Sequence, residues 1–158
     1  MIEYRNGDLF AGSEKICIHG CNAQGKYASG FAGVVRGTYP AAYDAYMASY
    51  KAGTLVLGSL SWAVCDGRLI VNAVTQKFFG RDGKRYVDYN AVRQAFSGLN
   101  SLVLSIQNGE RIFVELGSDI STVAMPKIGA GLAGGDWNVI AEIIEEEAIS
   151  FQPIVYVI

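Results

Sequence analysis

The stretch "PKIGAGLAGGDW", residues 126–137, separates an apolar run from a segment with helical periodicity. It contains four glycines: Gly129, Gly131, Gly134 and Gly135. A turn needs one or two glycines, and each further glycine costs conformational entropy on folding. The surplus indicates a loop whose backbone another molecule approaches closely. Because this loop joins a strand pattern to a helix pattern, it also indicates an α/β fold.

A second glycine-rich loop lies near the amino terminus, within "HGCNAQGKYASGFAGVV", residues 19–35. Gly25, Gly30 and Gly33 follow a buried strand pattern and open a helix near Gly30. The N–H groups at a helix start carry partial positive charge and suit a phosphate. The spacing fits neither a P-loop nor a dinucleotide fingerprint. The alternative is that these glycines serve only a tight turn and helix packing.

The rest of the chain interleaves strand and helix patterns. Strands are expected at residues 1–4, 15–22, 54–65, 68–76, 111–116, 123–128 and 153–158, and helices from near 30 and at 39–53, 88–107 and 136–148. This order predicts one domain over residues 1–158, with three α/β/α layers around a mixed central sheet. Ligands of such sheets bind outside the carboxyl ends of the strands, where both glycine-rich loops fall.

Composition narrows the class of function. The 158 residues are 51% hydrophobic and 18% charged, which supports a well-buried core. A net charge of -2 argues against binding of duplex nucleic acid. Three cysteines without paired spacing predict neither a disulfide scaffold nor a zinc site, and we expect no metal and no cofactor. The cysteine usage makes the reducing cytosol the expected compartment, and the chain shows neither a signal peptide nor a membrane-spanning run. We also expect a monomer.

Three polar residues stand near the predicted strand ends. His19, the one histidine, is either a satisfied core side chain, as a lone histidine usually is, or an acid/base group. Asn22 either caps the loop or hydrogen-bonds a sugar hydroxyl. Asp8, in "NGDLF", is either a turn residue or an acceptor for an exocyclic amine such as that of adenine, with Leu9 as an apolar wall.

Together, "NGDLF", "ICIHGCNAQGKYASGFAGVV" and "MPKIGAGLAGGDW" resemble the macrodomain, the module that binds ADP-ribose. The resemblance spans nearly the whole chain, in the right order. The "HGCN" variant, the "YPAAYDAY" helix and the "GGDW" ending are most similar to the branch of ADP-ribose-1''-phosphate phosphatases, which includes phage-encoded members. A phage-encoded protein would act in the host cytoplasm.

The resemblance implies a site for ADP-ribose or a derivative. It places Asp8 at the adenine amine, Asn22 at the distal ribose and the 126–137 loop around the diphosphate. The residues expected to bind the ligand are Asp8, Leu9, Cys21, Asn22, Ser29, Gly30, Phe31, Ile128, Gly129, Ala130, Gly131, Leu132 and Ala133.

The first functional hypothesis is hydrolysis of the terminal phosphate of ADP-ribose-1''-phosphate. His19 would act as acid or base, and Asp136 would activate water or act as nucleophile unless it is only a helix N-cap. Lys77, or the basic loop residues Arg81, Lys84 and Arg85, would hold the leaving phosphate unless that loop is only solvated.

Two alternatives remain: a reader or sponge for ADP-ribose without turnover, and a hydrolase that removes ADP-ribose from proteins. One related branch performs that removal with a lysine after a strand-end threonine and an aspartate in the second loop. This chain has Gln76 at the first place, with Lys77 one position further on, and Ala133 at the second, so it departs from the pattern on which that covalent mechanism depends.

Overall fold

A six-stranded sheet organises the computed structural model, which describes residues 1–28, 30–80 and 82–157. The strand order is β1-β6-β5-β2-β4-β3. The strands are β1 (Glu3–Asn6), β2 (Ile16–Asn22), β3 (Leu60–Cys65), β4 (Arg68–Gln76), β5 (Thr122–Met125) and β6 (Gln152–Val157). Neighbouring strands are parallel except for β3, which pairs antiparallel with β4. The predicted mixed sheet is confirmed.

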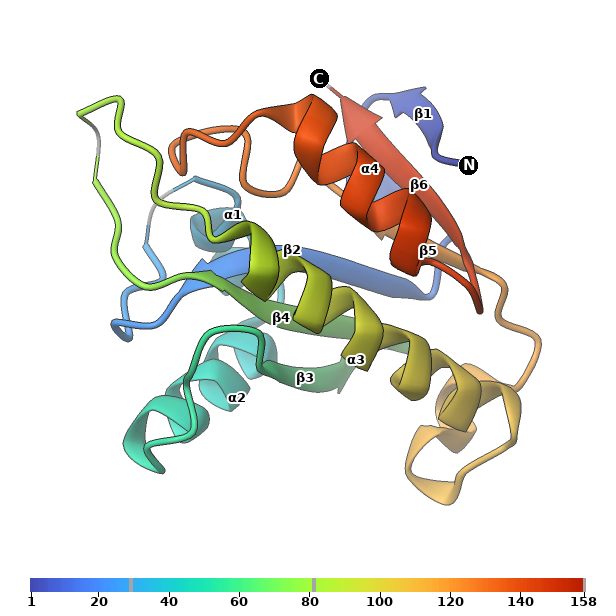
Figure 1. The fold of residues 1–158 in the computed structure, drawn as a ribbon. Coiled ribbons are helices and arrows are strands. Elements are labelled where there is room, and N and C mark those ends of the chain that lie inside the picture. Colours follow the sequence, from blue (N-terminus) through green and yellow to red (C-terminus); the bar gives the residue numbers. More distant parts are fainter. Residues whose placement is uncertain (29, 81, 158) are drawn as a thin grey trace.

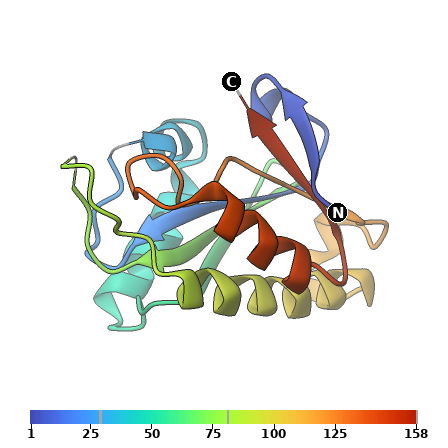
Figure 2. The ribbon, with the colours of Figure 1, turned by 45° about the horizontal axis from the view of Figure 1, so that its top comes forward.

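Helices cover both faces of this sheet (Figures 1 and 2). Helices α3 (Tyr89–Gln107) and α4 (Trp137–Glu147) pack on one face, and α1 (Gly30–Thr38) and α2 (Pro40–Lys51) pack on the other. Side chains alternate along β4 with the period of two that a strand requires. Leu69 joins the core beneath α3 and α4, whereas Ile70 joins the core beneath α1 and α2. The three α/β/α layers are therefore as expected.

Local sequence accounts for where the helices begin. The side chain of Asp88 accepts a hydrogen bond from the Ala91 N–H, and that of Asp136 accepts one from the Asn138 N–H, each at 2.9 Å. These are N-caps, which satisfy backbone donors that a helix start leaves free. Pro40 is the first residue of α2, where its missing N–H is harmless.

One predicted strand is wrong. Residues Arg111–Leu116 form a short 3-10 helix, η2, rather than a strand. Phe113 and Leu116 are buried three residues apart, the repeat of a 3-10 helix, while Ile112 and Val114 are 68% and 75% exposed. The strand predicted for 54–65 is also shorter than expected and begins at Leu60. A turn in which Gly58 has φ 84° precedes it.

Three loops gather at one end of the sheet (Figures 1 and 2). They connect β2 to α1 (blue), β4 to α3 (lime green) and β5 to α4 (orange). The register between β2 and β4 is irregular here: Cys21 pairs with Val74 and Asn22 pairs with Gln76, which leaves Thr75 as an extra residue in β4. Such bulges redirect side chains and are frequent beside functional sites.

Candidate functional site

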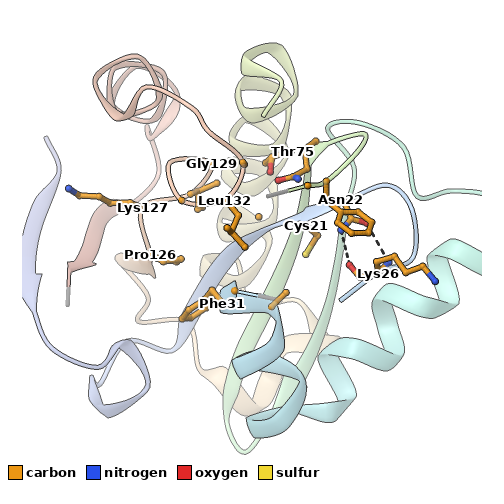
Figure 3. A pocket seen from close by; sticks show the side chains of 18 residues that line it. Cys21, Asn22, Lys26, Phe31, Thr75, Pro126, Lys127, Gly129 and Leu132 are labelled. Carbon is orange, nitrogen blue, oxygen red and sulfur yellow. Dashed lines mark hydrogen bonds between the residues drawn. The ribbon is translucent and has the colours of Figure 1, made fainter. Parts of the chain in front are cut away.

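A cavity of about 540 Å³ opens among these three loops (Figure 3). Its size is typical of a site for a nucleotide-sized ligand. The lining comes from the carboxyl ends of β2, β4 and β5, from the start of α1 and from the 126–133 loop. These residues are Gly20, Cys21, Asn22, Lys26, Gly30, Phe31, Ala32, Thr75, Gln76, Phe79, Gly80, Pro126, Lys127, Ile128, Gly129, Gly131, Leu132 and Ala133.

The 126–135 loop presents its backbone to the cavity. It is folded back on itself by hydrogen bonds from Gly135 N to the Gly129 carbonyl at 2.7 Å and from Gly134 N to the Gly131 carbonyl at 3.0 Å. Among the described residues, no group accepts a hydrogen bond from the N–H of Gly131, Leu132 or Ala133. Free, successive N–H groups in a curled loop form a cradle for an anion.

Gly129 and Gly131 differ in what surrounds them. Gly129 has φ 77°, and a Cβ there would lie 2.7 Å from Val87 Cγ2 and 3.1 Å from Ile140 Cδ1. Gly129 therefore belongs to the packing of the loop on the core. A Cβ at Gly131 would meet nothing within 4 Å, so this glycine faces open space at the cavity.

The start of α1 forms the facing wall. Gly30, with φ 59°, opens the helix, and Phe31 follows it into the cavity lining (Figure 3). The first N–H groups of a helix carry partial positive charge, which adds to the field of the facing loop. Lys26 and Lys127 also line the cavity, whereas the described lining contains no carboxylate. The cavity is therefore electrostatically suited to an anionic ligand.

His19 lies in the core and does not line the cavity. It is 1% exposed, and its Nε2 lies 2.7 Å from Asn72 Oδ1 and 2.9 Å from the Tyr27 hydroxyl. Burial lowers the pKa of His19 to about 4, against the opposing effect of the Asn72 hydrogen bond, so the ring is neutral at pH 7. The geometry gives no support to the predicted acid/base role of His19.

Asn22 reaches the cavity, but its side chain holds the loop together. Its Oδ1 accepts hydrogen bonds from Gln24 N and the Tyr46 hydroxyl, both at 3.0 Å, and its Nδ2 donates to the Lys26 carbonyl at 2.8 Å (Figure 3). The neighbouring Cys21 also lines the cavity. Burial raises the pKa of its thiol, which therefore stays protonated and is not an activated nucleophile.

The other predicted catalytic residues lie outside the cavity. Asp136 is exposed and serves as the N-cap of α4. Lys77 and Arg85 line a separate surface pocket with Phe78. Lys84 is exposed beside Asp82, and Arg81 lies outside the described residues.

Most of the predicted ligand-binding residues do come together. Cys21, Asn22, Gly30, Phe31, Ile128, Gly129, Gly131, Leu132 and Ala133 all line the cavity. Asp8 is exposed as the N-cap of the short 3-10 helix η1 (Leu9–Ala11), and Leu9 is buried; neither lines the cavity, nor does Ala130. Ser29 lies outside the described residues. Contact between these residues and a ligand stays a prediction.

Sequence reasoning missed the contribution of β4 and of the loop that follows it. Thr75, Gln76, Phe79 and Gly80 line the cavity. The available signal was their position directly at the end of a predicted buried strand, the same signal that drew attention to Asn22.

Within residues 1–28, 30–80 and 82–157, no group of three or more His, Cys, Asp or Glu side chains is placed to hold a metal ion. None of the helices in that part of the chain is long and apolar enough to cross a membrane.

The chain has relatives of two named activities. It is 29% identical over 156 residues to the DNA ADP-ribosyl glycohydrolase of Mycobacterium tuberculosis, covering 95% of this chain but 38% of that protein. It thus spans well under half of that relative. It is 26% identical to the ADP-ribose 1''-phosphate phosphatase of Candida albicans, covering 92% of this chain and 93% of that protein. An uncharacterised 17.5 kDa protein of Enterobacteria phage T4 is 30% identical, over 92% of this chain and 88% of its own. No family model matches the chain.

Solved structures share the fold over its full length. A protein of unknown function from Bacteroides thetaiotaomicron has a TM-score of 0.82 at 29% identity, covering 99% of this chain and 97% of that one. The macrodomain of Mycobacterium tuberculosis DarG has a TM-score of 0.79 at 20% identity, with coverage of 99% and 97%. A macrodomain protein from Streptomyces coelicolor has a TM-score of 0.77 at 24% identity, with coverage of 100% and 99%. Fold, motif order and relatives agree: the chain belongs to the macrodomain family, and its relatives of similar length include ADP-ribose 1''-phosphate phosphatases.

Proposed function

We propose that this macrodomain binds ADP-ribose in the cavity and hydrolyses the terminal phosphate of ADP-ribose-1''-phosphate. The observation that carries the proposal is the pair of facing backbone walls. The free N–H groups of the 131–133 loop lie opposite the start of α1, with Lys26 and Lys127 in the same lining. A diphosphate between these walls would be held by dipoles and charge without a metal ligand set.

The strand order gives the ligand a direction. Asp8 follows β1 at one edge of the sheet, the glycine cradle follows β5, and Gln76 ends β4 beyond β2. With adenine toward Asp8 and the diphosphate at the cradle, the distal ribose reaches the ends of β2 and β4. The terminal phosphate would then lie near Asn22, Lys26 and Gln76.

Catalysis in this arrangement would come from positioning and charge. The described lining holds no carboxylate and no imidazole, so the chain's own groups orient the phosphate and stabilise its developing charge. Lys26 lies in the loop that follows Asn22, and its side chain, which extends away from the cavity in Figure 3, would turn toward the phosphate to supply such charge. Gln76 replaces the lysine on which the covalent glycohydrolase mechanism of a related branch depends, which favours the phosphatase activity over that mechanism.

Because the described lining holds no carboxylate and no imidazole, a second candidate function is binding of ADP-ribose without turnover. A reader or sponge needs the cradle but no acid or base. The described lining matches that requirement, because its polar groups are amides, lysines, a thiol and a hydroxyl.

Two measurements test the proposal. Calorimetry should detect ADP-ribose binding, and phosphate release should follow when ADP-ribose-1''-phosphate is added. Binding without phosphate release would select the reader. No binding of ADP-ribose would overturn both candidates. Release of ADP-ribose from modified protein or DNA, measured in parallel, would instead indicate a glycohydrolase.

A further inference from the structure

A second pocket, which has no part in the proposed function, is formed by the loop between β4 and α3 (lime green in Figure 1) and by the start of α3. Its volume is about 520 Å³, and the lining residues that matter here are Lys77, Phe78, Arg85, Tyr86, Asp88 and Tyr89. Phe79 and Gly80 of the same loop line the cavity instead. The cavity and the second pocket therefore share this loop as a wall.

Two cations of the second pocket have no carboxylate partner. Within residues 1–28, 30–80 and 82–157, neither Lys77 nor Arg85 forms an ion pair. Each lies beside an aromatic ring instead: Arg85 Cζ is 4.6 Å from the centre of the Tyr89 ring, and Lys77 Nζ is 5.5 Å from the centre of the Phe78 ring. A contact with a ring leaves the charge of a cation in place, so both cations remain available to an anion.

The carboxylates of this region are already engaged. Asp88 lines the second pocket, but its side chain caps α3 by accepting a hydrogen bond from Ala91 N at 2.9 Å, where the positive end of the helix offsets its charge. Asp82 accepts a hydrogen bond from the Tyr86 hydroxyl at 2.7 Å. The described lining of the second pocket thus carries two cations against one carboxylate, and that carboxylate is a helix cap.

An exposed aromatic ring stands beside these cations. Phe78 is 53% exposed, although a ring of this size normally gains by burial. Tyr86 and Tyr89 are half-buried in the same lining. Flat rings next to cations are the two elements with which proteins hold single-stranded nucleic acid: bases stack on the rings, and phosphates pair with the cations.

We propose that the second pocket binds a single-stranded nucleic acid, with a base stacked on Phe78 and the flanking phosphates paired with Lys77 and Arg85. An acidic peptide would pair with the cations but would bring no flat ring to Phe78. A duplex keeps its bases stacked inside the double helix, out of reach of an exposed ring, and the net charge of -2 disfavours it further.

The bound strand would lie directly beside the cavity. Gln76, which lines the cavity, donates a hydrogen bond from Nε2 to the Phe78 carbonyl at 2.8 Å, so one short segment connects the two binding regions. This inference goes beyond the proposed function and does not depend on it.

The test is fluorescence anisotropy with a labelled thymidylate decamer. Phe78→Ala should weaken binding roughly tenfold, the effect of losing one stacked base. Because Phe78 is more than half exposed, this variant should keep the melting temperature and the ADP-ribose affinity of the parent. Two paired phosphates predict that log affinity falls with log salt concentration with a slope of about -1.4. Lys77→Gln and Arg85→Gln should each weaken binding and make this slope shallower by about 0.7.

Arg36→Gln is the matched control for Arg85→Gln. Arg36 Cζ lies 4.0 Å from the centre of the Tyr43 ring, and Arg36 lines neither the cavity nor the second pocket. The control therefore removes the same charge and the same kind of contact elsewhere, and it should change neither the affinity for the decamer nor the slope. Equal effects of Arg36→Gln and Arg85→Gln would show that overall charge is responsible and would overturn the assignment to the second pocket.

Three further results would overturn the proposal. Displacement of the decamer by saturating ADP-ribose would place the strand in the cavity. Competition by a decaglutamate peptide as strong as that by unlabelled decamer would indicate a site for any polyanion. Failure of the parent to bind the decamer, or full affinity in Phe78→Ala, would leave no role for the exposed ring. A parent that binds the decamer but not ADP-ribose would instead overturn the proposed function alone.

Discussion

The end of β2 and the 126–135 loop both looked like ligand sites, but they use their polar groups differently. At the end of β2, the ring of His19 is paired with Asn72 and Tyr27, and the side chain of Asn22 is paired with its own loop. In the 126–135 loop, backbone N–H groups at residues 131–133 have no partner among the described residues. The polar side chains at the end of β2 are satisfied within the protein, whereas the backbone N–H groups of residues 131–133 are free to bind a ligand.

Side-chain chemistry is therefore a weaker guide to this site than backbone geometry. A polar side chain at a strand end can be satisfied internally, and then it contributes shape and stability. A glycine loop with free donors has no such internal use for them.

Gly131→Glu should have the largest effect and confirm that the loop is the anion cradle. A carboxylate placed in open space at the cavity would repel the diphosphate and occupy its volume. We expect at least a hundredfold loss of ADP-ribose affinity by calorimetry, about 3 kcal/mol, with little change in melting temperature. Gly37→Glu is the matched control, because a Cβ at Gly37 in α1 also meets nothing within 4 Å. Equal loss in both variants would mean that charge alone, not location, is responsible.

The pH dependence of stability should confirm that His19 is a core residue. Its folded pKa of about 4 lies below the ordinary value of 6.5, so the unfolded chain binds the proton more readily. Stability from the neutral ring is present above pH 6.5 and is lost as the pH falls toward 4, by about 2 to 3 kcal/mol.

Denaturant unfolding between pH 7 and pH 4.5 provides the measurement for His19. The parent should lose about 2 to 3 kcal/mol more than His19→Gln over this range, since the carboxylates contribute equally to both. Parallel pH profiles would show that His19 is not held neutral. Loss of turnover in a folded His19→Gln would restore its catalytic role.

Gly129→Ala should separate the two glycines of the cradle. The positive φ and the contacts with Val87 and Ile140 predict a loss of about 2 kcal/mol in unfolding free energy. Gly131→Ala should leave the unfolding free energy within about 0.5 kcal/mol of the parent. Equal stability of the two variants would contradict the division of the loop into a packed and an open glycine.

Asp136→Asn should have the smallest effect. Asparagine keeps the N-cap of α4, and Asp136 does not line the cavity, so stability should change by less than about 0.5 kcal/mol. Phosphate release and ADP-ribose affinity should match the parent. A fall of a hundredfold or more in phosphate release would return Asp136 to the reaction.

Local patterns predicted much of this fold because short-range physics decides them. Asp88 and Asp136 cap their helices within two or three residues of themselves, and the turn at Asp66 and Gly67 joins β3 to β4 as expected. The segment 111–116 was predicted wrongly because its apolar residues suit a strand as well as a one-sided helical turn. Its burial, with Phe113 and Leu116 on the core, distinguishes the two.

The family, the layered α/β architecture and the two glycine-rich loops can be predicted from the chain alone, because motif order and hydrophobic periodicity are local properties of the sequence. Which polar groups are free depends instead on the folded structure. The ring of His19 is paired with Asn72, 53 residues away along the chain, and with Tyr27, 8 residues away. Asn22 is paired within its own loop, and Tyr46, 24 residues away, adds a further hydrogen bond. The position of Thr75 at the end of β4 is set by the irregular register between β2 and β4. Whether a polar group is satisfied depends on partners brought together by folding, and such partners leave no trace in local spacing.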